Sequence, residues 1–584
     1  MRALKNLNLK LLLALLVALT AFLLRLQGSA TLPYYPDEGM VAETSWRLSQ
    51  GLPLAVGAVK QTALFPITTS PLPLLGGALA QKLFGGDALR RLRLWSMALG
   101  ALTCGALVWV LWALSPLGAV LAGTALALMP LARLLDQMGF YHHLGALVAV
   151  GVLGALLAYQ RGPVPRRLFW LGAAAGLAVA AAYWSLWLLV LPIAAAWTTG
   201  RRGDLKWLWI PLLMPMAAVL AWSYFSDPAS FGQDLLALKD ASSGDLPGIW
   251  NHLRAAFGFS RAAQEYPSLW LGLGAIGLVL YFEGAARWTS ATFWLVAWAC
   301  LVSFEVFRQR QNLEAFSYPL ILVVAPLAAL LSLVFVRGLA WARSRRPLFL
   351  LLPLCLGVGS LWSLAKVPHL LYMNNASARP WDTQRLIEAL PKFGQFGDLI
   401  IGQTNINWAL AAQGYRVTDL DQVALASGMK GLFMAANLPA SRYTFVPRLD
   451  QAKLLILSPY SHGIAFAREG TRRIGLMADK AGWTKLREEG DFSIYGNPAM
   501  GFKAPKTAER ILKYYNLYDL AAQEAFDRQE YELAYFGALQ ALPYVEGDRQ
   551  ARLALLAKVQ AVLARNKAPQ KNVPNQTQVI GAPK

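Results

Sequence analysis

Two adjacent carboxylates follow the first hydrophobic segment of the chain, in the stretch YYPDEGMVAE at residues 34–43. Asp37 and Glu38 form the pair, and Glu43 lies a short distance further on. A carboxylate beside a bilayer is costly unless it binds a cation or takes part in proton transfer, and a positioned carboxylate can remove the proton of a weakly nucleophilic hydroxyl. The alternative is a solvated loop in which the acidic pair has no chemical role.

Composition indicates a polytopic membrane protein with a water-soluble part. Of the 584 residues, 56% are hydrophobic and only 15% are charged, which is less charge than a soluble protein of this length carries. The net charge of +21 comes mostly from short Lys and Arg clusters between apolar segments, where they orient helices. We therefore expect no nucleic-acid partner. Cys104, Cys300 and Cys355 all lie in apolar runs and indicate neither disulfides nor a Cys-based metal site.

Membrane-spanning helices are the elements that must position the carboxylates. A span needs about 20 mainly apolar residues, and this measure predicts about eleven of them. The first is a retained helix rather than a signal peptide, because its apolar run is long and contains Arg25. We expect the spans near residues 8–27, 94–113, 117–135, 138–160, 167–182, 184–199, 206–224, 266–283, 289–306, 316–336 and 347–364.

Basic clusters set the expected orientation. With a cytoplasmic N-terminus, the clusters at 161–167, 201–206 and 337–346 fall inside, as the positive-inside rule requires. The arginines at 90–93 and at 308–310 fall outside. Misplaced arginines indicate either an error in the topology or a binding site for an anion, and the agreement of the other clusters favours the anion site.

The predicted fold class is thus a polytopic α-helical membrane protein with an outer C-terminal part. An odd number of spans places that part on the same side as the acidic pair. We expect a transmembrane domain at 1–364 with a first outer loop at 28–93, and an α/β domain at 365–500 because strand-length apolar runs alternate there with helix-like stretches. A helical hairpin at 501–566 and a disordered tail at 567–584 follow from periodicity and composition.

An ordered set of short motifs resembles the front third of one large family. The set runs from DEGMVAE at 37–43 through GLP at 51–53, SPL at 70–72 and LFG at 83–85 to the segment from Leu89 to Ser96. It resembles the polyprenyl-phosphate-sugar-dependent glycosyltransferases of the GT-C fold, which include protein O-mannosyltransferases and lipid A aminoarabinose transferases. The similarity covers residues 30–200 and, more weakly, 290–340. Beyond residue 365 no relative is recognised.

The resemblance implies an enzyme that moves a sugar from a polyprenyl-phosphate donor to an extracytoplasmic protein, lipid or glycan, with inversion. Asp37 matches the family's catalytic base in the first loop, and Glu38 is assigned with it to the catalytic pair. The leaving phosphate needs cationic partners, and we assign Arg308, Arg310, Lys60 and Arg93 to it. Where relatives carry a Lys before the loop proline, this chain has Thr68-Thr69-Ser70-Pro71.

A second group of polar residues lies in or beside the apolar segments. The family often has an arginine and an acidic residue at the outer end of the third span, and Arg133 and Asp136 match that position. We expect Asp136, with Glu43 and His142, to support the acceptor or a divalent metal ion. The alternatives are an Arg–Asp pair that neutralises itself and a structural role for Glu43. Adjacent His142 and His143 diverge by about 100° on a helix and cannot chelate jointly. No cofactor is certain.

Two functions from different classes stay open. One is the membrane glycosyltransferase, in the bacterial inner membrane, with a membrane lipid donor. The other is a non-catalytic GT-C-like scaffold subunit whose outer domain binds a protein partner, which the missing loop Lys favours. A transporter fits less well, because the hydropathy pattern shows no repeat. The sugar, the acceptor and the metal do not follow from the sequence.

Overall fold

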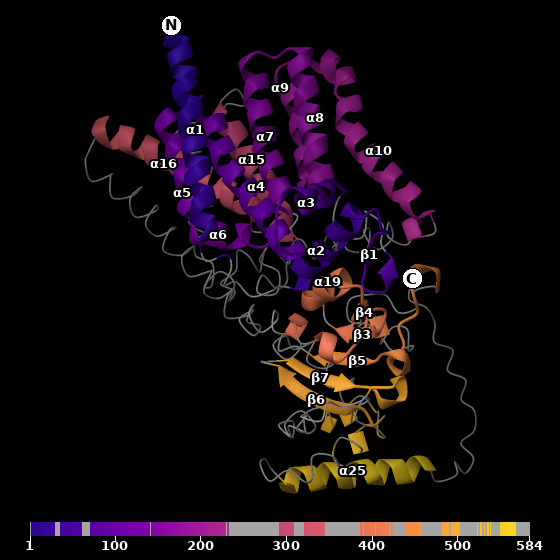
Figure 1. The fold of residues 1–584 in the computed structure, drawn as a ribbon. Helices are drawn as coiled ribbons and strands as arrows, with labels where there is room; N and C mark the ends of the chain where they lie inside the picture. The colour runs from indigo at the N-terminus through magenta and orange to yellow at the C-terminus, as the bar shows by residue number, and fades with distance from the viewer. Residues whose placement is uncertain are drawn as a thin grey trace.

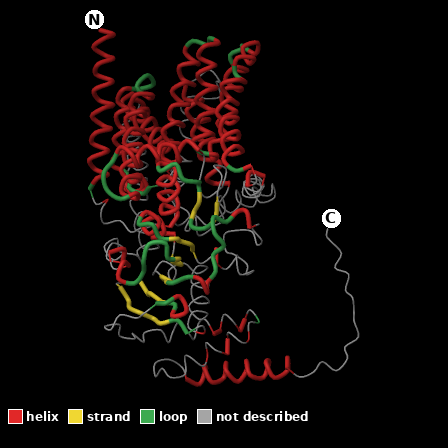
Figure 2. Tube along the Cα trace, turned by 45° about the vertical axis from the view of Figure 1, so that its right-hand side comes forward, coloured by secondary structure: helices red, strands yellow, loops and turns green. Residues whose placement is uncertain are grey.

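The structure is a computed structural model of the whole chain. The residues that it describes are 2–27, 29, 36–60, 71–139, 142–228, 230–232, 291–308, 321–344, 386–388, 390–402, 404–419, 422–423, 440–457, 480, 482–489, 492–502, several positions between 522 and 538, and 549–567. Most helices gather at one end of the molecule, the larger sheet lies beyond them, and a further helix lies at the far end, as Figures 1 and 2 show.

A bundle of apolar helices forms the first part of the molecule (Figure 1). Its core is made of small and branched apolar side chains from most of its helices, while α1 exposes many leucines on its outer surface, as expected of a helix that faces lipid. The described members are α1 (Arg2–Leu26), α4 (Ala88–Leu111), α5 (Pro116–Leu128), α6 (Pro130–Asp136), α7 (His142–Arg161), α8 (Pro165–Ala181), η2 (Tyr183–Leu189), α9 (Val190–Thr198), η3 (Arg202–Trp207), α10 (Trp209–Ser226), α15 (Ala291–Arg308) and α16 (Ile321–Ser344).

Four helical segments in the described part of the chain are long and apolar enough to cross a membrane. They are Leu7–Leu26, Ala88–Leu111, His142–Arg161 and Arg202–Ser226. Shorter apolar helices pack between them. Together with the leucines on the surface of α1, these segments identify an integral membrane protein with several helices in the bilayer.

The expected spans correspond to helices wherever the structure describes them, with one correction. We expected a single helix near 117–135, but the chain breaks between α5 and α6. Met129 is extended, with φ −60° and ψ 118°, because the residue before a proline is driven out of the helical region and Pro130 has no N–H to donate. The expected spans 266–283 and 347–364 lie outside the described residues.

The first loop is a small structure of its own between α1 and α4. It contains α2 (Pro36–Ser49), an antiparallel hairpin of β1 (Ala55–Val56) and β2 (Val59–Lys60), and the apolar helix α3 (Pro71–Leu83). Pro36 begins α2, where its fixed φ suits the first turn and its missing N–H costs nothing. α4 starts at Ala88, with Asp87 accepting from the Arg90 amide at 2.8 Å, so the arginines at 90–93 lie in its first turns rather than in a loop.

A five-stranded sheet forms the described core of the C-terminal region. Its strands are β3 (Leu399–Gly402), β4 (Arg416–Asp419), β5 (Leu454–Leu457), β6 (Thr484–Glu489) and β7 (Phe492–Gly496), with α19 (Thr404–Ala412) after β3 and the separate helix α25 (Arg549–Lys567) near the end. The order is β4-β3-β5-β7-β6, the first three strands being parallel and the last two antiparallel to their neighbours. Apolar clusters cover both faces of the sheet.

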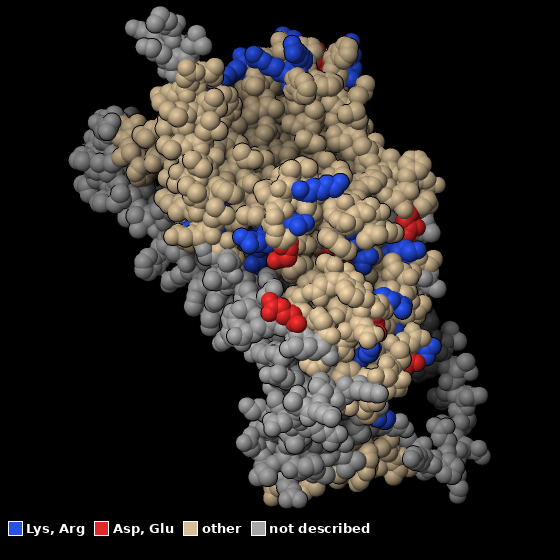
Figure 3. All heavy atoms as spheres, viewed as in Figure 1, with Lys and Arg blue, Asp and Glu red and all other residues tan. Residues whose placement is uncertain are grey.

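The first loop and the sheet lie at the same end of the helix bundle, and exposed basic residues mark the other end. Figure 1 places α2 next to α19, which lies beside β4 at the near edge of the sheet, and the side chains of α2 and α19 share one apolar cluster. Figure 3 shows blue side chains at the upper end of the helices, separated from the lower charges by a largely uncharged belt. The helix ends between α7 and α8 and between α9 and α10 carry exposed arginines, at 161, 166, 167, 201 and 202.

We expect opposite labelling of the two ends of the bundle. In a variant without the chain's own three cysteines, single cysteines at the exposed positions Gln50 and Met500 should react with a membrane-impermeant maleimide from the same side. A cysteine at the exposed Arg202 should react from the opposite side. Opposite accessibility of Gln50 and Met500 in intact cells would show that the arrangement of the loop and the sheet is wrong.

Candidate functional site

Glu38 is held by an ion pair that joins three parts of the chain. Arg93 of α4 donates from Nε to Oε1 at 2.6 Å and from Nη2 to Oε2 at 2.8 Å, and the backbone N–H of Gly139, after α6, donates to Oε1 at 2.6 Å. Glu38 is fully buried and Arg93 nearly so. A two-pronged guanidinium–carboxylate contact fixes orientation as well as charge, so the first turn of α2 has a defined position against α4.

Asp37 precedes this pair in the first turn of α2. Its backbone is described, while its side chain lies outside the described residues. The N-terminal turn of a helix favours a negative charge, because unpaired backbone N–H groups point out of it. Asp37 is thus next to a residue whose position is fixed. Glu38 itself anchors α2 to α4, a structural role that its residue type alone does not indicate.

Asp136, the second acidic residue of interest, pairs with Arg25 of α1. The Arg25 Nε donates to Asp136 Oδ2 at 2.6 Å, and both residues are buried. We considered a pair between Asp136 and Arg133, and the structure corrects this expectation. Arg133 instead donates from Nη2 to the Leu24 carbonyl at 3.0 Å. Because α1 and α6 lie side by side, Arg25 of α1 reaches the Asp136 carboxylate, while Arg133, on the same short helix as Asp136, bonds to α1 instead.

The polar side chains around Asp136 fasten the end of α1. Arg25 also donates to the Ala21 carbonyl at 3.1 Å and contacts Cys104 Sγ at 3.6 Å. Gln137 donates from Nε2 to the carbonyls of Arg25 and Gln27, both at 2.7 Å. The two hydrogen bonds from Gln137 satisfy carbonyls at the end of α1 that have no intrahelical partner and would be costly to leave unpaired inside a bilayer.

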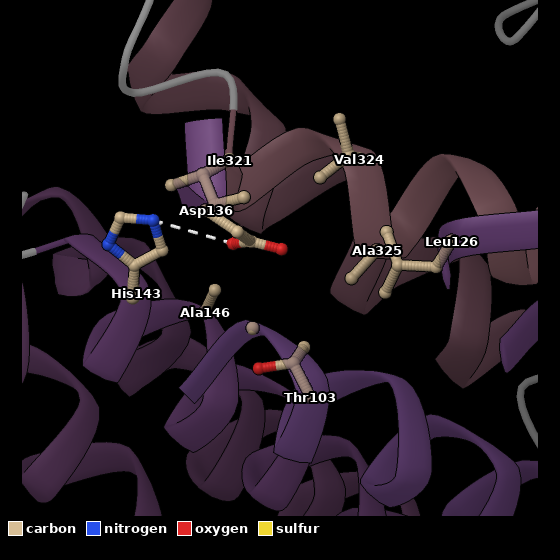
Figure 4. Close-up of a pocket in the computed structure, with 9 residues that line it drawn as sticks. Thr103, Leu126, Asp136, His143, Ala146, Ile321, Val324 and Ala325 are labelled. Atoms are coloured by element: carbon tan, nitrogen blue, oxygen red, sulfur yellow. Dashed lines mark ion pairs between the residues drawn. The ribbon is translucent and has the colours of Figure 1, made fainter. Parts of the chain in front are cut away.

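His143 faces the other oxygen of Asp136. Its Nε2 lies 3.4 Å from Asp136 Oδ1 and 3.0 Å from the Leu135 carbonyl, and Figure 4 shows the ring directed at the carboxylate, with Ile321 and Val324 of α16 nearby. His142, the residue that we assigned to acceptor or metal support, is fully buried at the start of α7. The backbone of Gly100 lies directly against the Asp136 carboxylate, so a side chain at that position would displace it.

A cavity borders Asp136 and His143, and Gly100, Thr103 and Ala146 also line it. Its volume is about 10 Å³, which is room for about one water molecule. A sugar phosphate does not fit there. Among the described residues no group of three or more His, Cys, Asp and Glu side chains is placed to hold a metal ion, and both Glu38 and Asp136 already have an arginine partner.

Glu43 connects α2 to the hairpin of the first loop. It is buried in the middle of α2, and it accepts from the Gly57 N–H at 3.1 and 3.2 Å and from Arg47 Nε at 3.0 Å. Burial raises the pKa of Glu43 above its ordinary value, and the positive charge of Arg47 and the Gly57 hydrogen bond oppose this rise.

The expected phosphate ligands are spread over three elements. Arg93 contacts Glu38, as described above. Lys60 ends β2 and is half-buried. Arg308 ends α15 with a side chain outside the described residues, and Arg310 lies outside them altogether. Sequence reasoning missed Arg25 as a site residue, although an arginine inside an apolar run is itself a signal for a buried partner.

The fold has a counterpart among solved structures. No family model matches the chain, and no curated protein matches it. The crystal structure of ArnT from Cupriavidus metallidurans bound to undecaprenyl phosphate matches with a TM-score of 0.53 and 16% identity, over 83% of this chain and 97% of ArnT. The apo state of the same protein matches with the same TM-score and identity, over 86% and 100%.

The chain therefore has the fold of a polytopic membrane protein of the GT-C class. The protein of known structure that it resembles is ArnT, and the match covers most of this chain and nearly all of ArnT. The resemblance found in the motifs of the first loop is thus confirmed at the level of the fold.

Removal of Arg93 should be far more harmful than removal of a surface arginine from the same helix. Arg93→Ala breaks the buried ion pair with Glu38, and removal of one partner of such a pair typically costs about 3–5 kcal/mol. Arg90→Ala, at an exposed position of α4, is the matched control. Thermal unfolding of the purified proteins in detergent measures both, and the double variant Glu38→Gln/Arg93→Gln should recover part of the loss. Equal melting temperatures for Arg93→Ala and Arg90→Ala would contradict the role of the pair.

Glu43 should make stability depend on pH. Because its pKa in the folded protein lies above the ordinary value of 4.5, the folded state holds the proton more tightly. The stabilisation is complete at pH below 4.5 and is lost as the pH rises through the raised pKa. Melting temperatures of wild type and Glu43→Gln, measured from pH 4 to 8, should therefore shift in favour of the variant as the pH rises. A difference that does not change with pH would contradict this expectation.

Proposed function

We propose that the protein is a membrane glycosyltransferase that moves a sugar from a polyprenyl-phosphate donor to an acceptor. The observation that carries the proposal is the match of the fold to ArnT, which has been crystallised with undecaprenyl phosphate, over nearly its whole length. The acidic pair at the start of α2 adds chemistry to the fold. A helix whose first turn is anchored through Glu38 presents the adjacent Asp37 in a reproducible position.

In the proposed reaction Asp37 is the general base. The acceptor hydroxyl gives its proton to the Asp37 carboxylate while its oxygen forms a bond to the anomeric carbon. The bond between that carbon and the phosphate oxygen breaks, the electron pair leaves with the lipid phosphate, and the configuration inverts. General-base catalysis of this kind contributes about 10²–10⁴-fold.

Cationic side chains must balance the charge that develops on the phosphate. Arg308, Arg310 and Lys60 are the proposed ligands. Arg93 contributes in a different way in this proposal, because its Nε and Nη2 groups are engaged by Glu38. It holds the first turn of α2, which carries Asp37, against α4.

We propose a bacterial inner membrane location, with the N-terminus in the cytoplasm and the sheet domain outside. The exposed arginines between α7 and α8 and between α9 and α10 support this orientation. The donor then reaches the first loop from the bilayer, and the acceptor reaches it from the extracytoplasmic side.

Two observations favour a second function, that of a non-catalytic GT-C-like scaffold. Glu38 and Arg93 neutralise each other, and the loop lacks the Lys that relatives carry before its proline. In that case the first loop keeps only structural charges, and the outer domain binds a protein partner. The two functions differ in what happens when Asp37 loses its charge.

Asp37→Asn should abolish most of the transfer activity. The amide keeps the size of the side chain but cannot accept a proton, so release of lipid phosphate from a panel of polyprenyl-phosphate sugars should fall about 10²-fold or more. Asp450→Asn, at an exposed position in the sheet domain, is the matched control and should leave turnover unchanged. Binding of the lipid donor to Asp37→Asn should persist.

A cell assay separates the two functions. The deletion strain is complemented with wild type or Asp37→Asn, with expression verified, and the envelope glycans are scored. Full rescue by Asp37→Asn would overturn the enzymatic proposal and favour the scaffold.

A further inference from the structure

The turn of the first-loop hairpin, at Val56, Gly57 and Ala58, is held from two sides. The Val56 carbonyl, the N–H and carbonyl of Gly57 and the N–H and carbonyl of Ala58 all have hydrogen-bond partners. These partners come either from α2 or from the C-terminal sheet domain. The turn therefore joins the helix that bears the acidic pair to a domain more than 350 residues away in sequence.

Helix α2 holds the middle residue of the turn. Glu43 accepts from the Gly57 N–H with both carboxylate oxygens, at 3.1 and 3.2 Å, and Arg47 donates from Nη2 to the Gly57 carbonyl at 3.5 Å. Glu43 and Arg47 also pair with each other at 2.9 Å, one helical turn apart. A shift of the turn therefore shifts α2 as well.

Gln422 of the sheet domain holds the residues on either side of Gly57. Its Nε2 donates to the Val56 carbonyl and its Oε1 accepts from the Ala58 N–H, both at 2.8 Å. The side chain is fully buried, and the Thr418 hydroxyl donates to the same Oε1 at 3.0 Å. A primary amide is the side-chain group that offers a donor and an acceptor side by side, so Gln422 takes the place of a neighbouring strand.

The approach of Gln422 requires a glycine in the turn. Gly57 has φ +56°, a left-handed conformation that other residues adopt at a cost. A Cβ atom on Gly57 would lie 2.7 Å from Gln422 Oε1. Both the backbone conformation and the close approach therefore explain why the turn contains glycine.

Further contacts between the hairpin and the domain surround this amide. Thr444 donates to the Ala58 carbonyl from its backbone N–H at 2.7 Å and from its hydroxyl at 3.0 Å, and Tyr443 forms an antiparallel bridge with Val59. On the other side of α2, Val41 and Ala42 pack against Trp408 and Ala409 of α19 in one buried apolar cluster.

We propose that Gln422 is a positioning residue for the acidic pair. The sheet domain holds the hairpin, the hairpin holds Glu43, and Glu43 holds α2 at a point about 9 Å along the helix axis from Asp37. Glu38 and Arg93 fix one end of α2, and the Gly57 turn fixes its middle. The inference rests on the proposed function, because positioning has a catalytic meaning only if Asp37 is the base.

The test compares Gln422→Ala with Gln451→Ala, an exposed glutamine of the same domain. Hydrogen–deuterium exchange of residues 55–60 and of α2 should rise about tenfold in Gln422→Ala and stay unchanged in Gln451→Ala. With polyprenyl-phosphate sugar as donor, kcat should fall about tenfold while the donor KM changes less than twofold, because misplacement of a base affects chemistry more than binding. Gln422→Glu, which keeps the acceptor for Ala58 but places an oxygen against the Val56 carbonyl, should have the same effect.

The outcomes separate the two proposals. Unchanged exchange, or raised exchange with unchanged kcat, overturns the positioning role and leaves the proposed function intact if the wild type turns over. An inactive wild type overturns the proposed function first. If Gln422→Ala does not fold, Thr444→Val removes one hydrogen bond to Ala58 without leaving a large cavity, and the same two measurements decide.

Discussion

A carboxylate removed from water needs a positive partner, and the position of the first loop depends on the buried pair of Glu38 and Arg93. Because breaking a buried ion pair typically costs several kcal/mol, the separation of α2 from α4 is strongly unfavourable. The Gly139 N–H extends the attachment to the segment after α6. The acidic pair thus stands on rigid helices rather than on a free loop, which is what a catalytic geometry needs.

The same physical rule shapes the neighbouring part of the bundle. Asp136 and Arg25 form a second buried pair, again between residues distant in sequence, and the hydrogen bonds of Gln137 complete the end of α1. Both pairs lie where polar groups meet the apolar bundle, and both use arginine, whose fork can satisfy several oxygens at once. Helix α1 is therefore joined to α6, and α2 to α4, by a buried ion pair, while apolar packing joins α1, α4 and α6 in the bundle core and α2 to α4 in a separate cluster.

Much of the fold follows from local signals in the sequence. Long apolar runs predict the helices of the bundle, and the strand-length runs at 398–402 and 453–458 predict β3 and β5, because burial on both faces requires continuous apolar residues. Pro130 is a signal for the break between α5 and α6, but high hydropathy on both sides favours one continuous span. The partners of Glu38, Asp136 and Gly57 could not be predicted, since each comes from a remote segment and only packing decides which arginine or glutamine arrives. Asp37 was chosen by motif, and its role is still a proposal.

The pairing of Arg25 with Asp136 has a consequence for biogenesis. The two residues are 111 positions apart, so a ribosome delivers the first helix to the insertion machinery long before the carboxylate exists. During that interval the helix carries an arginine without this partner in its last turn, where the charged group can reach the membrane interface and costs less than it would at the centre of a bilayer. The leucine-rich remainder of the helix offsets this cost and permits entry into lipid. The ion pair between the two helices can form only after α6 has been synthesised, so α1 reaches its final contacts after several later helices exist.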